Sequence, residues 1–290
     1  MASVDCIVES KNVLGECTLW CEREQVLWWV DSRGPSLWRH DPASGKTRTI
    51  PLPDVIGSFA FRERGGMLLA TASGFHFFDP ASGTLEPVVD PEAALPENRF
   101  NDGRSDRRGR FVSGTMSDVR RDPTGSLYRL DPDRSWAKLR SDIVVPNSIA
   151  WSPDDRTMYF ADTYRHTIWA YDYDIAGGAI SRERVFVDAS SHPGRPDGSC
   201  VDAEGCLWNA EYGGWRLVRY TPAGKIDRVI EMPVQNPTCC CFGGKDLDIL
   251  YVSSATQRLT PEDLAKQPLA GGVFAVRPGV KGLPEARFAG

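Results

Sequence analysis

The chain has 290 residues, of which 41% are hydrophobic, and its formal net charge is −5 at pH 7. The hydrophobic content is ample for a buried core, and the acidic balance provides no basic stripe for nucleic acid or for an anionic membrane. No apolar stretch approaches the roughly 20 residues that span a bilayer, and the first residues contain no signal-peptide core, so we expect a cytoplasmic protein.

Three short apolar runs recur in the same order six times along the chain. The last run of each copy is the easiest to recognise, and the six are SLWRHDP from Ser36, GFHFFDP from Gly74, SLYRLDP from Ser126, TIWAYDY from Thr167, RLVRYTP from Arg216 and GVFAVRP from Gly272. Their β-branched and aromatic residues, bounded by turn formers, are typical of strands. Six copies of a unit that contains several strands predict an all-β fold. The expected architecture is a six-bladed β-propeller with four-stranded antiparallel blades around a central channel.

The connections between the runs also have a definite chemistry. In DPASGK (41–46) and DPASGT (79–84), Asp begins the turn, Pro sets φ and Gly allows positive φ, as expected between neighbouring antiparallel strands. One helix is expected at 260–266, where Thr260 caps, Pro261 takes the first position and Asp263 completes a capping box. The segments SVDCIVES (3–10) and PEARFAG (284–290) are expected to pair and close the ring. Because no linker interrupts the repeats, we expect residues 1–290 to form one domain.

The eight cysteines are expected to be free, buried thiols. The run Cys239–Cys241 lies in a predicted strand, where alternate side chains point to opposite faces. No second Cys pair or His pair stands at zinc-ligand spacing, so a structural zinc site is not expected.

One position of the repeat repeatedly carries an oxygen-bearing side chain. It lies at the start of the first run of each copy, and the six residues there are Glu16, Gly57, Asp102, Asn147, Asp197 and Pro237. Because the first strands of a propeller line its channel, these residues should converge at one mouth. Several carboxylates in one pocket repel each other unless a cation joins them, and oxygen ligands favour a hard cation. Asp and Asn are also common turn residues, but repetition in phase favours the cation site.

A resemblance to a known family extends over nearly the whole chain. The segments LGECTLW, RFNDGRSDRRGRFVSGTM, VPNSIAWSPD and RPDGSCVDAEGCLW resemble the SMP-30/gluconolactonase/luciferin-regenerating-enzyme (LRE) family. The resemblance implies a six-bladed propeller that binds one divalent cation at the channel mouth and hydrolyses lactones of aldonic acids. It implies Glu16, Asn147 and Asp197 as metal ligands, and Arg99 and Asn101 as residues that bind the substrate.

The chain departs from the family pattern in one loop. Animal members carry a Glu after the GTM motif that helps to hold the substrate, and that position is Val119 here, beside Asp118. Substrate preference is therefore expected to differ from that of the animal enzymes. The segment from Asp202 to Gly224 is more similar to bacterial pentonolactonases.

These observations predict a metal-dependent aldonolactonase whose substrate is a sugar lactone, such as the pentono-1,4-lactone L-arabinono-1,4-lactone. Asp197 is the expected catalytic base, and Asp102 is placed with Arg99 and Asn101 in the substrate-binding set. The cation is Ca²⁺, Mg²⁺, Mn²⁺ or Zn²⁺. A promiscuous ester or phosphotriester hydrolase and a non-catalytic calcium-binding propeller remain as alternatives. A monomer or weak homodimer is expected.

The segment that leads up to Asp102, one of the six residues at the start of the first runs, is expected to be a flexible loop. Residues 91–104, PEAALPENRFNDGR, contain two prolines and no strand pattern. A long loop over a channel mouth would be a lid that brings Arg99 and Asn101 to the substrate.

Overall fold

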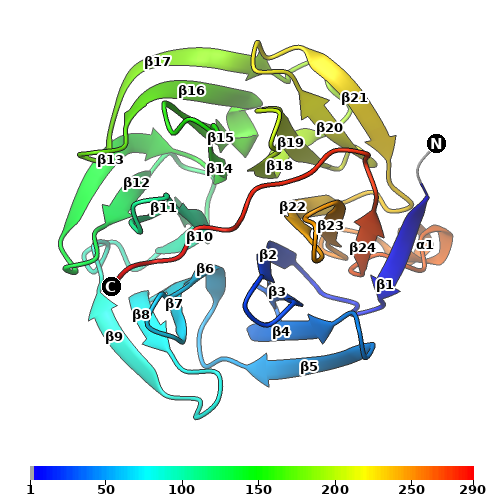
Figure 1. Ribbon diagram of the computed structural model, residues 1–290, viewed down its shortest axis with the longest axis horizontal. Coiled ribbons are helices and arrows are strands. Elements are labelled where there is room, and N and C mark those ends of the chain that lie inside the picture. The colour runs from blue at the N-terminus through cyan, green and yellow to red at the C-terminus, as the bar shows by residue number, and fades with distance from the viewer. Residues whose placement is uncertain (1–2) are drawn as a thin grey trace.

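Six four-stranded antiparallel sheets stand in a ring in the computed structural model, which describes residues 3–290 (Figure 1). The predicted all-β six-bladed propeller is therefore confirmed. Within these residues no helix has the length and apolar character needed to cross a membrane.

Five blades are each built from four consecutive strands. These are β2 (Gly15–Cys21), β3 (Val26–Asp31), β4 (Ser36–Asp41) and β5 (Lys46–Pro51); β6 (Ile56–Phe61), β7 (Met67–Thr71), β8 (Gly74–Phe78) and β9 (Leu85–Val89); β10 (Asn98–Ser105), β11 (Phe111–Ser117), β12 (Gly125–Leu130) and β13 (Trp136–Ile143); β14 (Pro146–Trp151), β15 (Thr157–Asp162), β16 (Thr167–Asp174) and β17 (Ala179–Asp188); β18 (Arg195–Val201), β19 (Leu207–Tyr212), β20 (Arg216–Tyr220) and β21 (Ile226–Glu231). The sixth blade combines β22 (Pro237–Gly243), β23 (Ile249–Ser254) and β24 (Val273–Val276) with β1 (Val4–Val8).

Burial decreases from the channel outwards within a blade. The inner strand β6 is buried at every position, whereas the outer strand β5 is exposed at nearly every position.

Large aromatic side chains fill the space between neighbouring blades. The ring centroids of Phe75 and Phe100 lie 4.3 Å apart between the second and third blades, and Trp20 stacks on Tyr251 at 5.5 Å between the first and the sixth. Packing between blades thus fixes the relative positions of the inner strands.

The ring is closed differently from the sequence prediction. Strand β1 pairs with β24, not with the C-terminal segment PEARFAG. The chain from Gly282 to its C-terminus crosses the ring (red in Figure 1) and forms isolated bridges from Gly282 to Asp202 and from Phe288 to Arg62. Asp202 and Arg62 directly follow the ends of two inner strands, so the C-terminal segment covers the channel at the end opposite the strand starts. Strand β1 occupies the outer edge of β24, so this edge is not free to pair with the C-terminal segment.

Two local structures that the sequence predicts, a turn and the start of a helix, are held by hydrogen bonds from side chains. Asp41 accepts the Ala43 amide at 2.9 Å, and Gly45 has a φ of +68° in the turn between β4 and β5. Helix α1 (Pro261–Lys266) begins with the predicted capping box, in which Thr260 and Asp263 exchange hydrogen bonds between side chain and backbone. Both predictions are confirmed.

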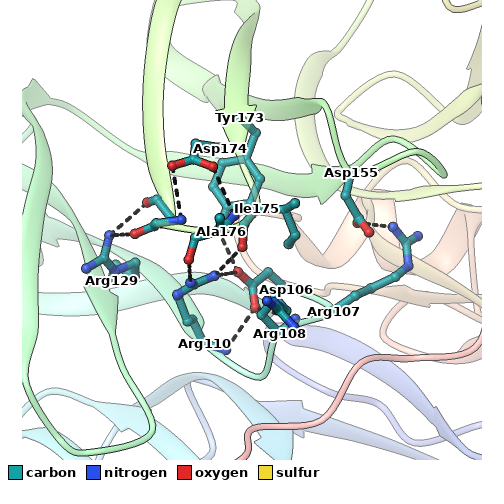
Figure 2. Close-up of polar contacts among 12 residues, drawn as sticks. Asp106, Arg107, Arg108, Arg110, Arg129, Asp155, Tyr173, Asp174, Ile175 and Ala176 are labelled. Carbon is teal, nitrogen blue, oxygen red and sulfur yellow. Dashed lines mark hydrogen bonds and ion pairs between the residues drawn. The ribbon is translucent and has the colours of Figure 1, made fainter.

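A polar network ties the third blade to the fourth at the end of the channel covered by the C-terminal segment (Figure 2). Asp106, in the turn after β10, accepts hydrogen bonds from Arg110 at 2.8 Å and from the Tyr173 hydroxyl at 2.6 Å. Arg110 also donates to the Ile175 carbonyl at 3.0 Å. This buried carboxylate is fully paired, so it stabilises the ring rather than offering a free functional group.

All eight cysteines are free in the described part of the chain, and seven of them are buried. Burial raises the pKa of the Cys17, Cys239 and Cys241 thiols well above the usual range. A thiolate is the reactive form of cysteine, so these side chains are chemically inert in the folded protein. The prediction of buried free thiols is confirmed for seven of the eight, since Cys6 is only half-buried.

We therefore expect iodoacetamide at neutral pH to modify the folded protein at Cys6 alone and to leave its activity unchanged. Intact-mass spectrometry counts the adducts, and an activity assay on the same sample gives the functional result. Loss of turnover in alkylated protein with an unchanged melting temperature would show that a cysteine takes part in catalysis.

Candidate active site

A shift of strand register occurs at one place in the inner strand of every blade. In β2, for example, it lies between Glu16 and Leu19, which pair with Val30 and Trp28 of β3. The shift leaves one extra residue in the inner strand, as in a β-bulge, which bends a strand and re-aims its side chains. The equivalent shifts in β14 and β18 lie beside Asn147 and Asp197. The predicted site residues therefore stand where the inner strands depart from regular alternation.

A cavity of about 420 Å³ opens at this end of the channel. Its lining includes five of the six predicted site residues, which are Glu16, Arg99, Asn101, Asn147 and Asp197. They come from the inner strands of four different blades, β2, β10, β14 and β18. A volume of this order is typical of sites for small molecules.

Glu16 and Asp197 form an acid pair in this cavity. Burial and the negative charge of Asp102 raise the pKa of Glu16 to about 8, against the opposing effect of Arg99. Burial and the charge of Glu16 raise the pKa of Asp197 well above its ordinary value. Within residues 3–290 no side chain donates a hydrogen bond to either carboxylate. Two such groups are costly to keep charged unless a cation compensates them.

A chain of hydrogen bonds fixes the third candidate ligand. Arg99 donates to the Asn101 side-chain oxygen at 2.9 Å, and the Asn101 amide donates to Oδ1 of Asn147 at 3.0 Å. The Asn147 amide in turn donates to the Thr163 hydroxyl at 2.7 Å. These contacts turn Oδ1 of Asn147 towards the third blade and Nδ2 towards Thr163. Asn147 is thus held in one orientation before any ligand binds.

The donor set fits a hard divalent cation. Two unpaired carboxylates and one oriented amide oxygen supply three oxygens, which suits Ca²⁺, Mg²⁺ or Mn²⁺ better than a metal that prefers nitrogen or sulfur. Among the described residues there is no group of three or more His, Cys, Asp or Glu side chains that could hold a metal. A cation bound here would therefore rely on the amide oxygen of Asn147 beside the two carboxylates, and water or substrate would supply its other oxygen ligands.

Arg99 lies on a strand and not on a flexible loop, which corrects the sequence prediction. Residues 98–105 form β10, and the side chain of Arg99 is only 4% exposed. Its Nε donates to Asp118 at 2.6 Å, and Nη1 donates to the Phe100 carbonyl at 2.8 Å. The turn-forming residues of RFNDGRS are accommodated by the register shift between Phe100 and Gly103. Arg99 is therefore a fixed wall of the cavity, and no lid movement is needed to place it.

Asp102 does not line the cavity, which corrects its place in the substrate-binding set. Its carboxylate accepts the amide of Ile149, in the next blade, at 3.1 Å and the amide of Gly103 at 2.9 Å. Asp102 thus ties β10 to β14, and its charge acts on the acid pair through space.

Asp118 occupies the loop in which the family pattern predicts a substrate-binding Glu. It forms a two-point ion pair with Arg33 and a third hydrogen bond with Arg99. Although partial burial opposes it, these two arginines lower the pKa of Asp118 to about 2. Val119 is 72% exposed and does not line the cavity. The loop therefore contributes through Asp118, which orients Arg99.

Sequence reasoning missed much of the cavity wall. Connections between the second and third strands of the blades contribute side chains such as Arg121, Tyr164 and Arg258, and Tyr212 at the end of β19 also lines the wall. His166 and His192 also line the wall, and Nδ1 of His192 lies 2.7 Å from buried Glu211. None of these residues lies on an inner strand, and loops carry no strand periodicity. Their only signal in the sequence is their common position in the repeat.

Comparisons with known proteins agree with this arrangement. Residues 14–256 match the family model described as the SMP-30/gluconolactonase/LRE-like region. The chain is 38% identical to the 6-deoxy-6-sulfogluconolactonase of Pseudomonas putida, with 99% of each chain covered, and 38% identical to the L-arabinolactonase of Azospirillum brasilense, with 98% and 95% covered. A crystal structure of regucalcin, a calcium-binding protein of Agrobacterium tumefaciens, superposes with a TM-score of 0.95 at 32% identity and covers 99% of this chain and 97% of its own.

Proposed function

The chain belongs to the SMP-30/gluconolactonase/LRE-like family and is a lactonase, and from this premise we propose that it hydrolyses a sugar lactone to the aldonic acid with one divalent cation. The observation that carries the proposal is the acid pair of Glu16 and Asp197, which shares one cavity with Arg99. The two lactonases among its relatives support the substrate class. The similarity to the structure of a calcium-binding protein, regucalcin, supports a cation.

In this proposal Glu16, Asn147 and Asp197 hold the cation. When bound, the cation supplies positive charge that stabilises the oxyanion developing on the lactone carbonyl. The raised pKa values of Glu16 and Asp197 support a cation site. A bound cation would offset the repulsion between the two carboxylates and favour their ionised forms.

Asp197 is the proposed general base. One of its oxygens accepts a proton from a water molecule while the water oxygen forms a bond to the carbonyl carbon. The bond between this carbon and the ring oxygen then breaks, and the ring oxygen takes the proton back from Asp197 and leaves as a hydroxyl group. Asp197 lines the cavity on the inner strand β18, so its carboxylate can reach a water molecule beside the lactone carbonyl.

Arg99 is proposed to bind oxygens of the lactone. Asp118 and the Phe100 carbonyl hold its guanidinium in one orientation, so little flexibility is lost when the substrate binds. Asn101 lines the same wall, but its amide is already committed to the Pro146 carbonyl and to Asn147, both at 3.0 Å. We therefore assign Asn101 mainly to positioning Asn147.

For the carbon skeleton we propose a pentono-1,4-lactone such as L-arabinono-1,4-lactone. The support is the relative named L-arabinolactonase, which is 38% identical over 288 residues. Ring size and stereochemistry are determined by hydroxyl contacts at the wall, which a panel of lactones can resolve.

The test is a pH-indicator assay, because each lactone hydrolysed near neutral pH releases one proton. The metal-loaded protein is offered pentono-1,4-, hexono-1,4- and hexono-1,5-lactones together with a phosphotriester. We expect sugar lactones to be hydrolysed with a kcat/KM at least about tenfold above the phosphotriester. Hydrolysis of the phosphotriester alone would replace this proposal by the alternative of a broad ester hydrolase.

A further inference from the structure

The walls of the cavity carry an excess of positive charge. Five arginines line it, against the two carboxylates of the acid pair; they are Arg33, Arg99, Arg121, Arg195 and Arg258. The protein as a whole has a net charge of −5. The cavity is therefore locally positive although the protein as a whole is negative. A divalent cation bound to the acid pair would make the cavity more positive still.

Two of the five arginines are paired with a carboxylate and three are not. Arg33 and Arg99 share the carboxylate of Asp118. Within residues 3–290, Arg121, Arg195 and Arg258 have no ion pair with any acidic side chain. Their charges are thus available at the surface of the cavity.

The three unpaired arginines gather around one aromatic side chain, Tyr164. The guanidinium carbons of Arg195 and Arg121 lie 4.5 and 5.1 Å from the centroid of its ring, and Arg258 donates to its hydroxyl at 3.0 Å. We call these four residues the distal cluster. They come from four different blades, since Arg121 follows β11, Tyr164 lies in the 3-10 helix η1 (Thr163–Arg165), Arg195 begins β18 and Arg258 follows β23.

This convergence has an electrostatic cost in the protein alone. Like charges around one ring repel each other, and the cation–π contacts and the hydrogen bond with Tyr164 offset only part of this repulsion. Although partial burial opposes it, hydrogen bonds from Arg258 and Arg121 and their charges lower the pKa of Tyr164 to about 8. The cluster therefore creates a region of positive potential. An anion would relieve the repulsion, just as a cation relieves that of the acid pair.

The distal cluster and the acid pair face the same cavity from different depths. Glu16 and Asp197 belong to inner strands. In the distal cluster, Arg121, Tyr164 and Arg258 lie in connections between second and third strands, and Arg195 is the first residue of β18, the strand that also carries Asp197. A substrate with its lactone carbonyl at the acid pair would direct the far end of its carbon chain towards these loops. The two ends of the cavity therefore recognise opposite charges.

We propose that the distal cluster binds an anionic substituent of the substrate, so that the preferred lactones carry a sulfonate, a phosphate or a carboxylate at the end of the chain remote from the lactone carbonyl. This inference rests on the proposed lactonase function for the orientation of the substrate. The proposal concerns only the charged group at the remote end of the lactone. Ring size and carbon number are selected by the residues of the inner strands. A neutral pentonolactone would then be a slower substrate than an anionic lactone of matching shape.

The kinetic test compares neutral gluconolactone with analogues that carry a phosphate or a sulfonate at C6, and with the lactone of an aldaric acid. For the wild type we expect the anionic lactone with the best-fitting group to exceed the neutral one in kcat/KM. In the double variant Arg121→Gln/Arg258→Gln this ratio is expected to fall about 10- to 100-fold, the range for lost charge-assisted hydrogen bonds. The advantage of the anionic lactone should also shrink as salt is raised.

The matched control is Arg120→Gln. Arg120 neighbours Arg121 in the sequence, pairs with Glu97 at 2.7 Å and Asp122 at 3.1 Å, and does not line the cavity. This change removes one positive charge from the loop that carries Arg121, and it should leave the ratio of anionic to neutral kcat/KM unchanged. Melting temperatures of all variants separate binding effects from loss of fold. A ratio that is unchanged in the double variant, or lowered equally by the control, would overturn the inference.

A binding measurement keeps this inference separate from the lactonase proposal. Calorimetry compares gluconate with 6-phosphogluconate on metal-loaded protein, since the two differ only in the distal phosphate. We expect the phosphorylated compound to bind at least about tenfold more tightly in the wild type and not in the double variant. If no lactone is hydrolysed but this difference appears, the lactonase proposal fails while the anion site stands. Equal binding of the two compounds would refute the anion site.

Discussion

Replacing Asp197 is expected to cause the largest loss of activity of any single change. We expect Asp197→Ala and Asp197→Asn to lower kcat/KM for the preferred lactone by on the order of 10²- to 10⁴-fold, the usual effect of losing a general base. The loss should be greater if the cation also dissociates, because among residues 3–290 only Asp197 and Glu16 present carboxylates to the cavity. Steady-state kinetics and calorimetry with the cation measure the two effects separately.

Two controls make this prediction sharp. Asp197→Asn keeps the shape of the side chain and removes only its charge, so the fold should survive; the raised pKa of Asp197 indicates that its charge is a burden on the folded state. Asp188→Asn removes an exposed carboxylate at the end of β17, outside the cavity, and should leave catalysis unchanged. Near-wild-type turnover of Asp197→Ala would rule out Asp197 as the base.

Replacing Arg99 is expected to have the second largest effect. We expect Arg99→Ala to lower kcat/KM about 10- to 150-fold, which corresponds to about 1.5–3 kcal/mol for a lost charge-assisted hydrogen bond. The fold should tolerate the change, because Asp118 keeps its two-point ion pair with Arg33. Arg99→Lys should recover only part of the loss, since an ammonium group cannot reproduce the planar fork of the guanidinium.

The kinetic constants distinguish two roles of Arg99. A loss confined to KM would indicate a contact made with the substrate before reaction, whereas a loss in kcat would indicate a contact that strengthens in the transition state. Cation binding measured on the same variant should change little, because Arg99 acts on Asn147 only through Asn101. If Arg99→Ala matched the wild type in kcat/KM, the substrate would have to be held by another blade.

The sequence predicted the inner strands well because each repeats the same apolar pattern. Glu16, Asn147 and Asp197 could be found without a structure, since their positions recur in phase and inner strands converge on the channel. The shifts of register beside them could not be read from composition. For this reason Arg99, which is followed by turn-forming residues, was expected on a loop although it lies on β10.

The outer part of the cavity was not predictable from strand patterns. Arg121, Tyr164 and Arg258 lie in loops far apart in the sequence, and only the closed ring brings them together. The C-terminal segment was also misplaced, because pairing with an open edge and crossing the far end of the channel make similar demands on composition. Long-range closure, unlike local periodicity, depends on how all six blades pack.

The most direct test of the account is a metal titration of the lactonase activity. Protein stripped with a chelator is returned to one divalent cation at a time, in steps below one equivalent, while turnover of the preferred lactone is followed with a pH indicator. We expect almost no turnover in the stripped protein and a rise that ends at one cation per chain; in the variant Glu16→Gln, which lacks one of the two carboxylates, the rise should no longer end at one equivalent. Full turnover by the stripped protein, with its metal content verified as negligible, would contradict the account.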